Sequence, residues 1–282
     1  TGGRSAHLAG GTGHRRPWRY GLDPMMFGGG KANLGGTART LDEVDGATEP
    51  ENGVPSFGGS ATLDDSTTMA VTTDGWVSAR TPGSTDVYLF AHGDDFKAAL
   101  ADFYRLTGPQ PLLPRWALGN WWSRYHPYSD GEYRQLMERF EADGVPFSVA
   151  VLDMDWHLVD VPPAYGTGWT GYTWNRELFP DPAGFMTWLH ERGLKVALNV
   201  HPADGVRAFE EPYERAARAL GIDPATEQTV DFDIADPSFL EVYFEQVHHP
   251  LEEEGVDFWW LDWQQGTHTS MAGLDPLWLL NH

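Results

Sequence analysis

The pattern of apolar and polar positions changes near residue 110. Before that point, short runs alternate between apolar and polar side chains and are separated by turn residues; they cover residues 67–72, 76–80 and 86–90. Alternation with a period of two predicts half-buried antiparallel strands, as in a sandwich. A helix is predicted to follow them, capped at its start by Asp94-Asp95.

After residue 110, apolar runs alternate with stretches of helical period. Four runs have the composition of buried strands, at residues 117–122, 147–152, 195–200 and 258–261. Capping signals precede three predicted helices: Ser129 with Glu132, Asp181-Pro182, and Asp236-Pro237. Alternation of strands and helices predicts a parallel sheet, either doubly wound or a (β/α)8 barrel. The helix after Asp236 is expected to bury Leu240, Phe244, Val247 and Leu251.

These patterns predict an α/β chain of two domains. Residues 1–108 would form an antiparallel β-sandwich-like domain, and residues 109–282 the first half of a (β/α)8 TIM barrel. A complete barrel takes about 250 residues, so the second segment has room for about four of the eight strands. The chain is therefore expected to be a fragment that stops after its fourth barrel strand.

Composition narrows the classes of partner. The chain has 41 Asp and Glu against 19 Lys and Arg, a formal net charge of −22. Such a surface repels phosphate backbones and anionic membranes, so neither nucleic acid nor membrane is an expected partner. There is no cysteine for disulfides or thiolate metal sites. No signal peptide is visible, and a cytoplasmic or a secreted location both remain open, as does oligomeric state. His248-His249 and the acidic run 252–254 are expected to face solvent.

Polar side chains follow three consecutive predicted strands. Asp153 and Asp155 come after the second strand, Asn199 and His201 close the third, and Asp262 follows the fourth. The C-terminal ends of parallel strands meet at one rim of a barrel, where barrel enzymes carry their active sites. We therefore expect these side chains to lie close together and to bind substrate.

The strand at residues 258–261 ends in a carboxylate between two indoles. Trp260 and Trp263 flank Asp262. Aromatic rings at such a position would offer apolar walls to the C–H faces of a sugar. The combination indicates glycoside chemistry, with an oligosaccharide or glycoside as the substrate.

Several segments also match one known family in consistent order. They are residues 113–125 (LPRWALGNWWSRY), 151–156 (VLDMDW), 178–182 (LFPDP) and 260–262 (WLD), with 106–108 (LTG) and 63–66 (LDDS) upstream. Together they resemble glycoside hydrolase family 31, the α-glucosidase and α-xylosidase family. The resemblance covers roughly residues 31–282. It implies a retaining α-glycosidase whose barrel follows an N-terminal β-domain.

The resemblance also implies roles for individual residues. The family uses two aspartates, a nucleophile and an acid/base, and the nucleophile falls on Asp262. Asp153 matches the aspartate that binds sugar hydroxyls in the −1 subsite, with Asp155 beside it. Asn199 and His201 match strand positions that face the same rim. No metal or organic cofactor is needed for this chemistry.

The chain departs from the family pattern at the nucleophile. Many members carry Asp-Met-Asn-Glu there, whereas this chain has Asp262-Trp263-Gln264-Gln265, so a preference for α-glucose does not carry over. The family's acid/base aspartate lies on a later strand, past residue 282. Two alternatives stay open: a non-catalytic carbohydrate-binding homologue, and a metal-dependent glycosyltransferase using Asp153 and Asp155 as an Asp-x-Asp motif.

Overall fold

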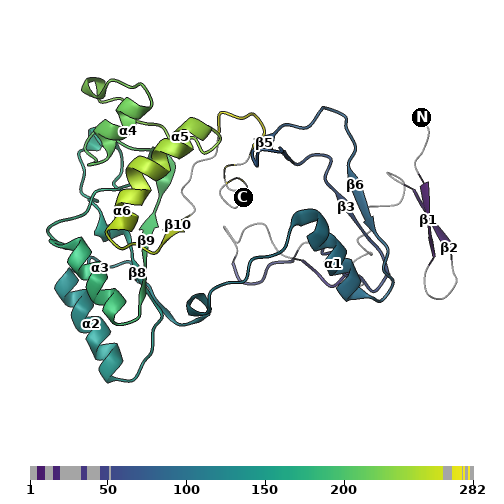
Figure 1. Cartoon of the computed structure of the whole chain (residues 1–282), viewed down its shortest axis with the longest axis horizontal. Coiled ribbons are helices and arrows are strands. Elements are labelled where there is room, and N and C mark those ends of the chain that lie inside the picture. Colours follow the sequence, from purple (N-terminus) through teal and green to yellow (C-terminus); the bar gives the residue numbers. More distant parts are fainter. Residues whose placement is uncertain are drawn as a thin grey trace. The chain divides into compact units, whose positions relative to one another are not determined.

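The computed structural model of the chain describes residues 5–9, 15–19, 33–36, 45–50, 52–262, 269–274, 276 and 279. The chain divides into two compact units, Thr1–Leu112 and Leu113–His282, which are described separately (Figure 1). In the described ranges, none of the helices is both long enough and apolar enough to cross a membrane.

The first unit consists of short antiparallel strand pairs and one helix. The pairs are β1 (Ser5–Ala9) with β2 (Arg15–Arg19), β3 (Ala61–Asp64) with β6 (Val87–Phe90), and β4 (Ala70–Val71) with β5 (Val77–Ser78). Helix α1 (Phe96–Thr107) follows, and the Asp95 carboxylate accepts a hydrogen bond from Ala98 N at 3.0 Å. Of the runs 67–72 and 76–80 that were predicted to pair, only Ala70–Val71 and Val77–Ser78 do so, and β3 was not predicted. The helix starts after the predicted cap, with Asp95 as the capping residue.

The second unit contains a four-stranded parallel sheet. Its spatial order is β7 (Trp121–Trp122), β8 (Val149–Leu152), β9 (Lys195–Val200) and β10 (Phe258–Leu261). The spatial order equals the chain order, and all neighbouring strands are parallel. This is the arrangement of successive strands in a (β/α)8 barrel, and it confirms the predicted fold class.

Helices connect successive strands of this sheet. Between β7 and β8 lies α2 (Asp130–Ala142), and between β8 and β9 lies α3 (Pro182–Glu191). The longer connection from β9 to β10 contains α4 (Tyr213–Ala219), α5 (Pro237–Val242), a π-helix (Tyr243–His248) and α6 (His249–Glu253). Short 3-10 helices cover Arg115–Leu118, Met154–Trp156, Pro163–Tyr165, Pro202–Asp204 and Pro224–Thr226.

The predicted helix starts are present as polar caps. Ser129 and Glu132 form a reciprocal capping box, with Ser129 N donating to Glu132 Oε2 at 2.9 Å and Glu132 N donating to Ser129 Oγ at 3.2 Å. Asp181 and Asp236 each accept a hydrogen bond from a backbone amide of the first helical turn. These side chains satisfy amides that the helix itself leaves without a partner.

Two predicted elements differ in the structure. Of residues 117–122, only Trp121–Trp122 pair in the sheet, because Arg115–Leu118 form a 3-10 turn that Ser148 Oγ holds through a hydrogen bond to Trp116 O (2.8 Å). The long helix after Asp236 contains the π-helix, whose wider turn shifts the buried face. The buried residues of this segment are Phe239, Tyr243, Val247, His248 and Leu251, whereas Phe244 is 47% exposed.

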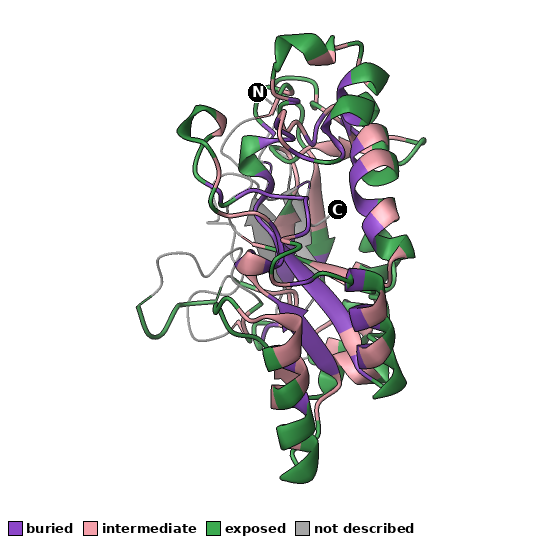
Figure 2. Cartoon of the chain, turned by 90° about the vertical axis from the view of Figure 1, so that its left-hand side faces the viewer, coloured by how far each residue is buried: buried purple, intermediate pink, exposed green. Residues whose placement is uncertain are grey.

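The two faces of the sheet pack against different partners. On one face, Val149, Val151 and Ala197 form a small cluster with the rings of Trp116, Trp121 and Phe258. On the other face, the alternate residues of β8 and β9 pack against the helices in the main core. Figure 2 shows β8 and β9 as buried strands with partly exposed helices beside them. In a closed barrel, the face with the small cluster is the interior.

Candidate active site

The predicted site residues extend the interior face of the sheet beyond the ends of the strands. Side chains alternate along a strand, so the position two residues after Val151 and the positions two and four residues after Ala197 and Phe258 point to the same side as these residues. Those positions are Asp153, Asn199, His201, Trp260 and Asp262. They lie at the C-terminal ends of the strands, where barrel enzymes hold catalytic groups.

Asp262 is held by two side chains of the neighbouring strand. Asn199 Nδ2 donates a hydrogen bond to Asp262 Oδ2 at 3.2 Å, and His201 Nε2 lies 3.6 Å from the same oxygen. Asp262 N also donates to Val200 O at 3.0 Å, which continues the β9–β10 ladder. Asn199 and His201 are 3% exposed, whereas the Asp262 side chain is 34% exposed. The carboxylate is thus oriented by β9 and partly exposed.

Burial favours the neutral form of the His201 imidazole. Burial lowers the pKa of His201, and the charges of Asp262 and Asp153 offset this only in part. Within the described residues, Nδ1 of the ring has no hydrogen-bond partner. The tautomer with a proton on Nε2 would point an N–H dipole at Asp262 without adding a full positive charge.

The two carboxylates after β8 lie in the 3-10 turn Met154–Trp156 or next to it. Asp153 Oδ1 accepts a hydrogen bond from Met154 N at 2.8 Å. Burial, together with the charge of Asp153, raises the pKa of Asp155. One oxygen of Asp155 is buried and has no hydrogen-bond partner among the described residues. Asp153 and Asp155 line one small pocket with Arg124 and His126.

Trp156 links the end of β8 to β9. Its indole is fully buried, and Nε1 donates to Asn199 O at 2.8 Å. The backbone of Asn199 is therefore anchored on one side while its side-chain amide reaches Asp262 on the other.

No group of three or more His, Asp or Glu able to hold a metal ion is found in the ranges that the structure describes.

The structure describes only one of the two tryptophans that were predicted to line the site. Trp260 lies two residues before Asp262 on the interior face, is 39% exposed, and has its ring 6.2 Å from that of Trp121. Trp263 lies outside the described residues.

Sequence reasoning missed Trp169 and Arg207. The Trp169 ring lies 5.1 Å from the His201 ring, although the two residues are far apart in sequence. Arg207 is 3% exposed and donates to backbone carbonyls on both sides of Trp169. A tryptophan between Gly168 and Gly171 in a loop after a strand was the signal available for this feature.

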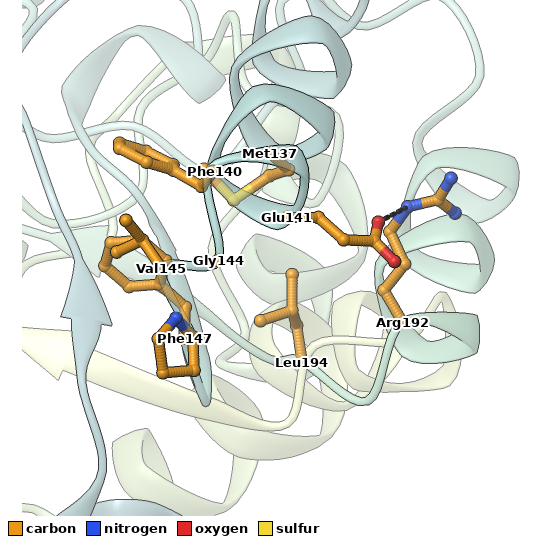
Figure 3. Close-up of a pocket in the computed structure, with 9 residues that line it drawn as sticks. Met137, Phe140, Glu141, Gly144, Val145, Phe147, Arg192 and Leu194 are labelled. Carbon is orange, nitrogen blue, oxygen red and sulfur yellow. Dashed lines mark ion pairs between the residues drawn. The ribbon is translucent and has the colours of Figure 1, made fainter.

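A separate pocket of about 380 Å³ lies at the opposite end of the strands (Figure 3). Residues from the end of α2 and from the loops that enter β8 and β9 line it, among them Phe140, Phe147 and Leu194. Glu141 and Arg192 face each other at its edge, with Oε2 and Nε 3.9 Å apart. Because barrel chemistry takes place at the C-terminal ends of the strands, this pocket is not the candidate active site.

Comparison with known proteins identifies the family. The sequence profile "Glycosyl hydrolases family 31 TIM-barrel domain" matches residues 110–275. The chain belongs to glycoside hydrolase family 31. Two curated relatives of this family 31 chain are an α-xylosidase of Saccharolobus solfataricus, 27% identical over 178 residues, and α-glucosidase 2 of Bacillus thermoamyloliquefaciens, 32% identical over 130 residues. The alignments cover 62% and 46% of this chain.

The same relatives show how much of a family 31 protein the chain represents. It spans 22% of the length of the α-xylosidase and 15% of that of the α-glucosidase. A solved xylosidase from Aspergillus niger shares the fold with a TM-score of 0.61 at 17% identity, over 97% of this chain and 44% of that one.

Proposed function

We propose that the chain carries the nucleophile half of a retaining α-glycosidase that hydrolyses terminal α-linked sugars by double displacement. The observation that carries the proposal is the Asp262 carboxylate, partly exposed at the end of β10 and contacted on Oδ2 by Asn199 and His201. Family membership makes glycosidase activity the expected chemistry, and the relatives named above are α-xylosidases and α-glucosidases.

In the first step of this mechanism, ionised Asp262 attacks the anomeric carbon of the bound sugar. The bond from that carbon to the leaving oxygen breaks as the ester bond to Asp262 forms, and a separate carboxylic acid protonates the leaving oxygen. That acid then acts as a base and removes a proton from water, which releases the sugar from Asp262. Asn199 and His201 would fix the direction of attack by holding one carboxylate oxygen in place.

The neighbouring side chains suit the recognition of the attacked sugar. Asp153 would accept hydrogen bonds from sugar hydroxyls, and such charge-assisted bonds are about twice as strong as neutral ones. Asp155, with a raised pKa, would support Asp153 or bind a hydroxyl itself. Trp260 and Trp263 would line the sugar's apolar faces.

The assignment of Asp262 is tested in the full-length protein. Asp262→Ala should lower kcat by at least about three orders of magnitude, the scale seen when a covalent nucleophile is removed. External azide should restore part of the turnover of an activated aryl α-glycoside. A mechanism-based fluoroglycoside should label the peptide that contains Asp262. Asp160→Ala, at an exposed loop position, is the matched control and should leave kcat unchanged.

Each other outcome assigns a different function. Near-normal kcat in Asp262→Ala, or labelling at another residue, would remove Asp262 as the nucleophile. Sugar binding without turnover or labelling would favour a carbohydrate-binding homologue. Loss of activity on addition of a chelator, with a nucleotide sugar as donor, would favour the glycosyltransferase that uses Asp153 and Asp155.

The 282-residue chain by itself is expected to be inactive. Four described parallel strands leave β10 with an open edge, and retention needs a second carboxylate about 5–5.5 Å from the nucleophile. The test compares residues 1–282 with a version extended through the later barrel strands, on the same aryl α-glycosides. Equal activity of the two would contradict this expectation.

A further inference from the structure

We propose that Trp169 forms a wall of the subsite for the leaving-group sugar, and that Arg207 is the positioning residue that holds this wall in place. The inference rests on the proposed function, because it takes Asp262 as the nucleophile.

Trp169 lies next to the contacts of Asp262. Its ring centroid is 5.1 Å from that of His201, with an interplanar angle of 75°, and His201 Nε2 is 3.6 Å from Asp262 Oδ2. The indole is therefore separated from the carboxylate by the width of one imidazole ring. Trp169 is 40% exposed, and the 63% exposed ring of Tyr125, from the loop after β7, lies 6.4 Å from it. Exposed aromatic surface thus borders the site on this side.

Arg207 holds the loop on both sides of Trp169. Its guanidinium is 3% exposed; Nη1 donates to Tyr165 O at 2.7 Å, and Nη2 donates to Thr170 O. Thr170 Oγ1 in turn donates to His201 O, and Asp204 N donates to Thr170 Oγ1 at 3.2 Å. The segment that presents Trp169 is therefore tied to the backbone of His201 itself.

A buried carboxylate accompanies this guanidinium. Glu210 Oε2 accepts hydrogen bonds from Thr173 Oγ1 at 2.6 Å and from Tyr172 N at 3.1 Å, and Glu210 Oε1 lies 3.7 Å from Arg207 Nη2. Desolvating two such charges is costly, and they are kept only where hydrogen bonds and geometry compensate. The contacts of Arg207 and Glu210 described here join the loop after β8 to the loop after β9, and none of them involves a strand of the sheet.

Two glycines allow the loop to pack closely around Trp169. At Gly168, with φ of +66°, a Cβ would lie 1.9 Å from Val159 O. At Gly171, a Cβ would lie 2.1 Å from Nδ1 of the buried His157. The backbone on both sides of the indole is thus fixed by packing, while the indole itself is left partly exposed. Such an arrangement suits an apolar platform for a ligand.

The position of Trp169 favours the leaving-group sugar over the attacked one. Asp153, Asn199 and Asp262 lie at the ends of strands and would surround the sugar whose anomeric carbon is attacked. Trp169 lies in the loop beyond the end of β8 and so further from the sheet. In an enzyme that removes terminal sugars, the next sugar of the chain lies on this outer side. The flat indole would stack against the C–H face of that pyranose.

The experiment uses two substrates in the full-length protein, one with and one without a leaving-group sugar. The pair is maltose with α-glucosyl fluoride, or α-xylosyl-(1→6)-glucose with α-xylosyl fluoride, whichever pair the wild type cleaves. Trp169→Ala should lower kcat/KM on the disaccharide by roughly 10-fold, mainly through KM, as expected for the loss of one aromatic stacking contact. It should change kcat/KM on the fluoride by less than about 2-fold.

Two further variants of the same loop act as controls. Trp169→Phe keeps an aromatic face and should recover most of the disaccharide activity. Tyr165→Phe removes only the hydroxyl that bonds to Glu227 at 3.2 Å and should match the wild type on both substrates. Equal effects of Trp169→Ala on the two substrates, or no effect on either, would overturn the subsite assignment.

The role of Arg207 is tested through Trp169. Arg207→Lys should reduce disaccharide activity selectively, and in the double variant with Trp169→Ala it should cause no further loss. Additive losses in the double variant would remove Arg207 as the positioning residue. Should Arg207→Lys fail to fold, the Trp169 variants still decide the subsite. Labelling of Asp262 by the fluoroglycoside separates the two proposals: without it the proposed function fails, and with it only the assignment of Trp169 is at stake.

Discussion

Asp257 directly precedes β10, the strand that Asp262 directly follows. Its Oδ1 accepts a hydrogen bond from Lys195 Nζ at 2.6 Å, and its Oδ2 accepts one from Val196 N at 2.8 Å and lies 2.8 Å from His190 Nε2. Burial alone would raise the pKa of Asp257, but these three partners together hold that pKa below its ordinary value. The carboxylate therefore joins β10 to β9 and to α3.

We expect Asp257→Ala to loosen β10 by about 2–4 kcal/mol. The bond to Val196 N involves a charged acceptor and is worth about 1.5–3 kcal/mol. Lys195 and His190 are 42% and 37% exposed, so each ion pair adds at most about 1 kcal/mol. At 1.4 kcal/mol per decade, the exchange of β10 amides with deuterium should become roughly 30- to 700-fold faster.

Hydrogen exchange followed by mass spectrometry in the full-length protein measures this change. The peptide with residues 255–262 should lose protection, while a peptide from α1 in the first unit should not. Lys195→Met removes only one exposed partner and should raise the exchange rate by about 5-fold or less. A change below about 3-fold in Asp257→Ala would refute the reasoning.

The stabilisation that the Asp257 carboxylate contributes should also depend on pH. A carboxyl with a depressed folded pKa contributes its stability above the unfolded pKa, and this contribution is lost as pH falls through the folded pKa. The difference between wild type and Asp257→Asn should therefore be full at pH 6 and shrink below about pH 4.

Two further predictions concern other titratable side chains. Asp153→Asn should lower kcat/KM by about two orders of magnitude, about 2.7 kcal/mol, because the amide cannot give charge-assisted bonds to sugar hydroxyls; an unchanged value would leave Asp153 a structural role only. Burial lowers the pKa of His248 to about 3, so between about pH 6.5 and 3 the unfolded chain binds a proton that the folded one lacks. Stability should fall with acid in this range by about 1.4 kcal/mol per pH unit. His248→Leu should flatten that slope and His249→Leu, at an exposed position, should not; thermal unfolding midpoints between pH 4 and 7 decide this.

Local signals in the sequence were sufficient to predict the parallel sheet and the residues at its C-terminal rim. The runs 195–200 and 258–261 match β9 and β10 because each is mostly apolar, lacks helical period and is bounded by turn residues. The caps at Ser129, Asp181 and Asp236 located helix starts for the same reason, since a cap depends on residues within one turn. The shared rim of parallel strand ends then predicted that Asn199 and Asp262 lie close together, and in the structure Asn199 Nδ2 donates to Asp262 Oδ2.

These local signals could not predict contacts between segments that are far apart in the sequence. Nothing local shows that Thr170 bonds to His201 or that Arg207 lies beneath the Trp169 loop. His248 was expected at the surface, but it is 2% exposed, because the π-helix rotates the following residues relative to a regular α-helix. Its ring lies 4.4 Å from that of Tyr243 and 4.1 Å from that of Trp259, which closes the space between the π-helix and β10.

The two aspartates that flank β10 show how the surroundings of a carboxylate determine its role. Asp257 and Asp262 are five residues apart, so the strand's period of two directs them to opposite faces of the sheet. Asp257 meets Lys195 and His190 on the helix side, where its charge is neutralised and serves stability. Asp262 lies on the interior side, where its Oδ2 is contacted by the Asn199 amide and by the His201 imidazole, whose neutral form burial favours. A register shift of one residue between β9 and β10 would exchange these faces, so the anchoring of Asp257 also determines where the Asp262 carboxylate points.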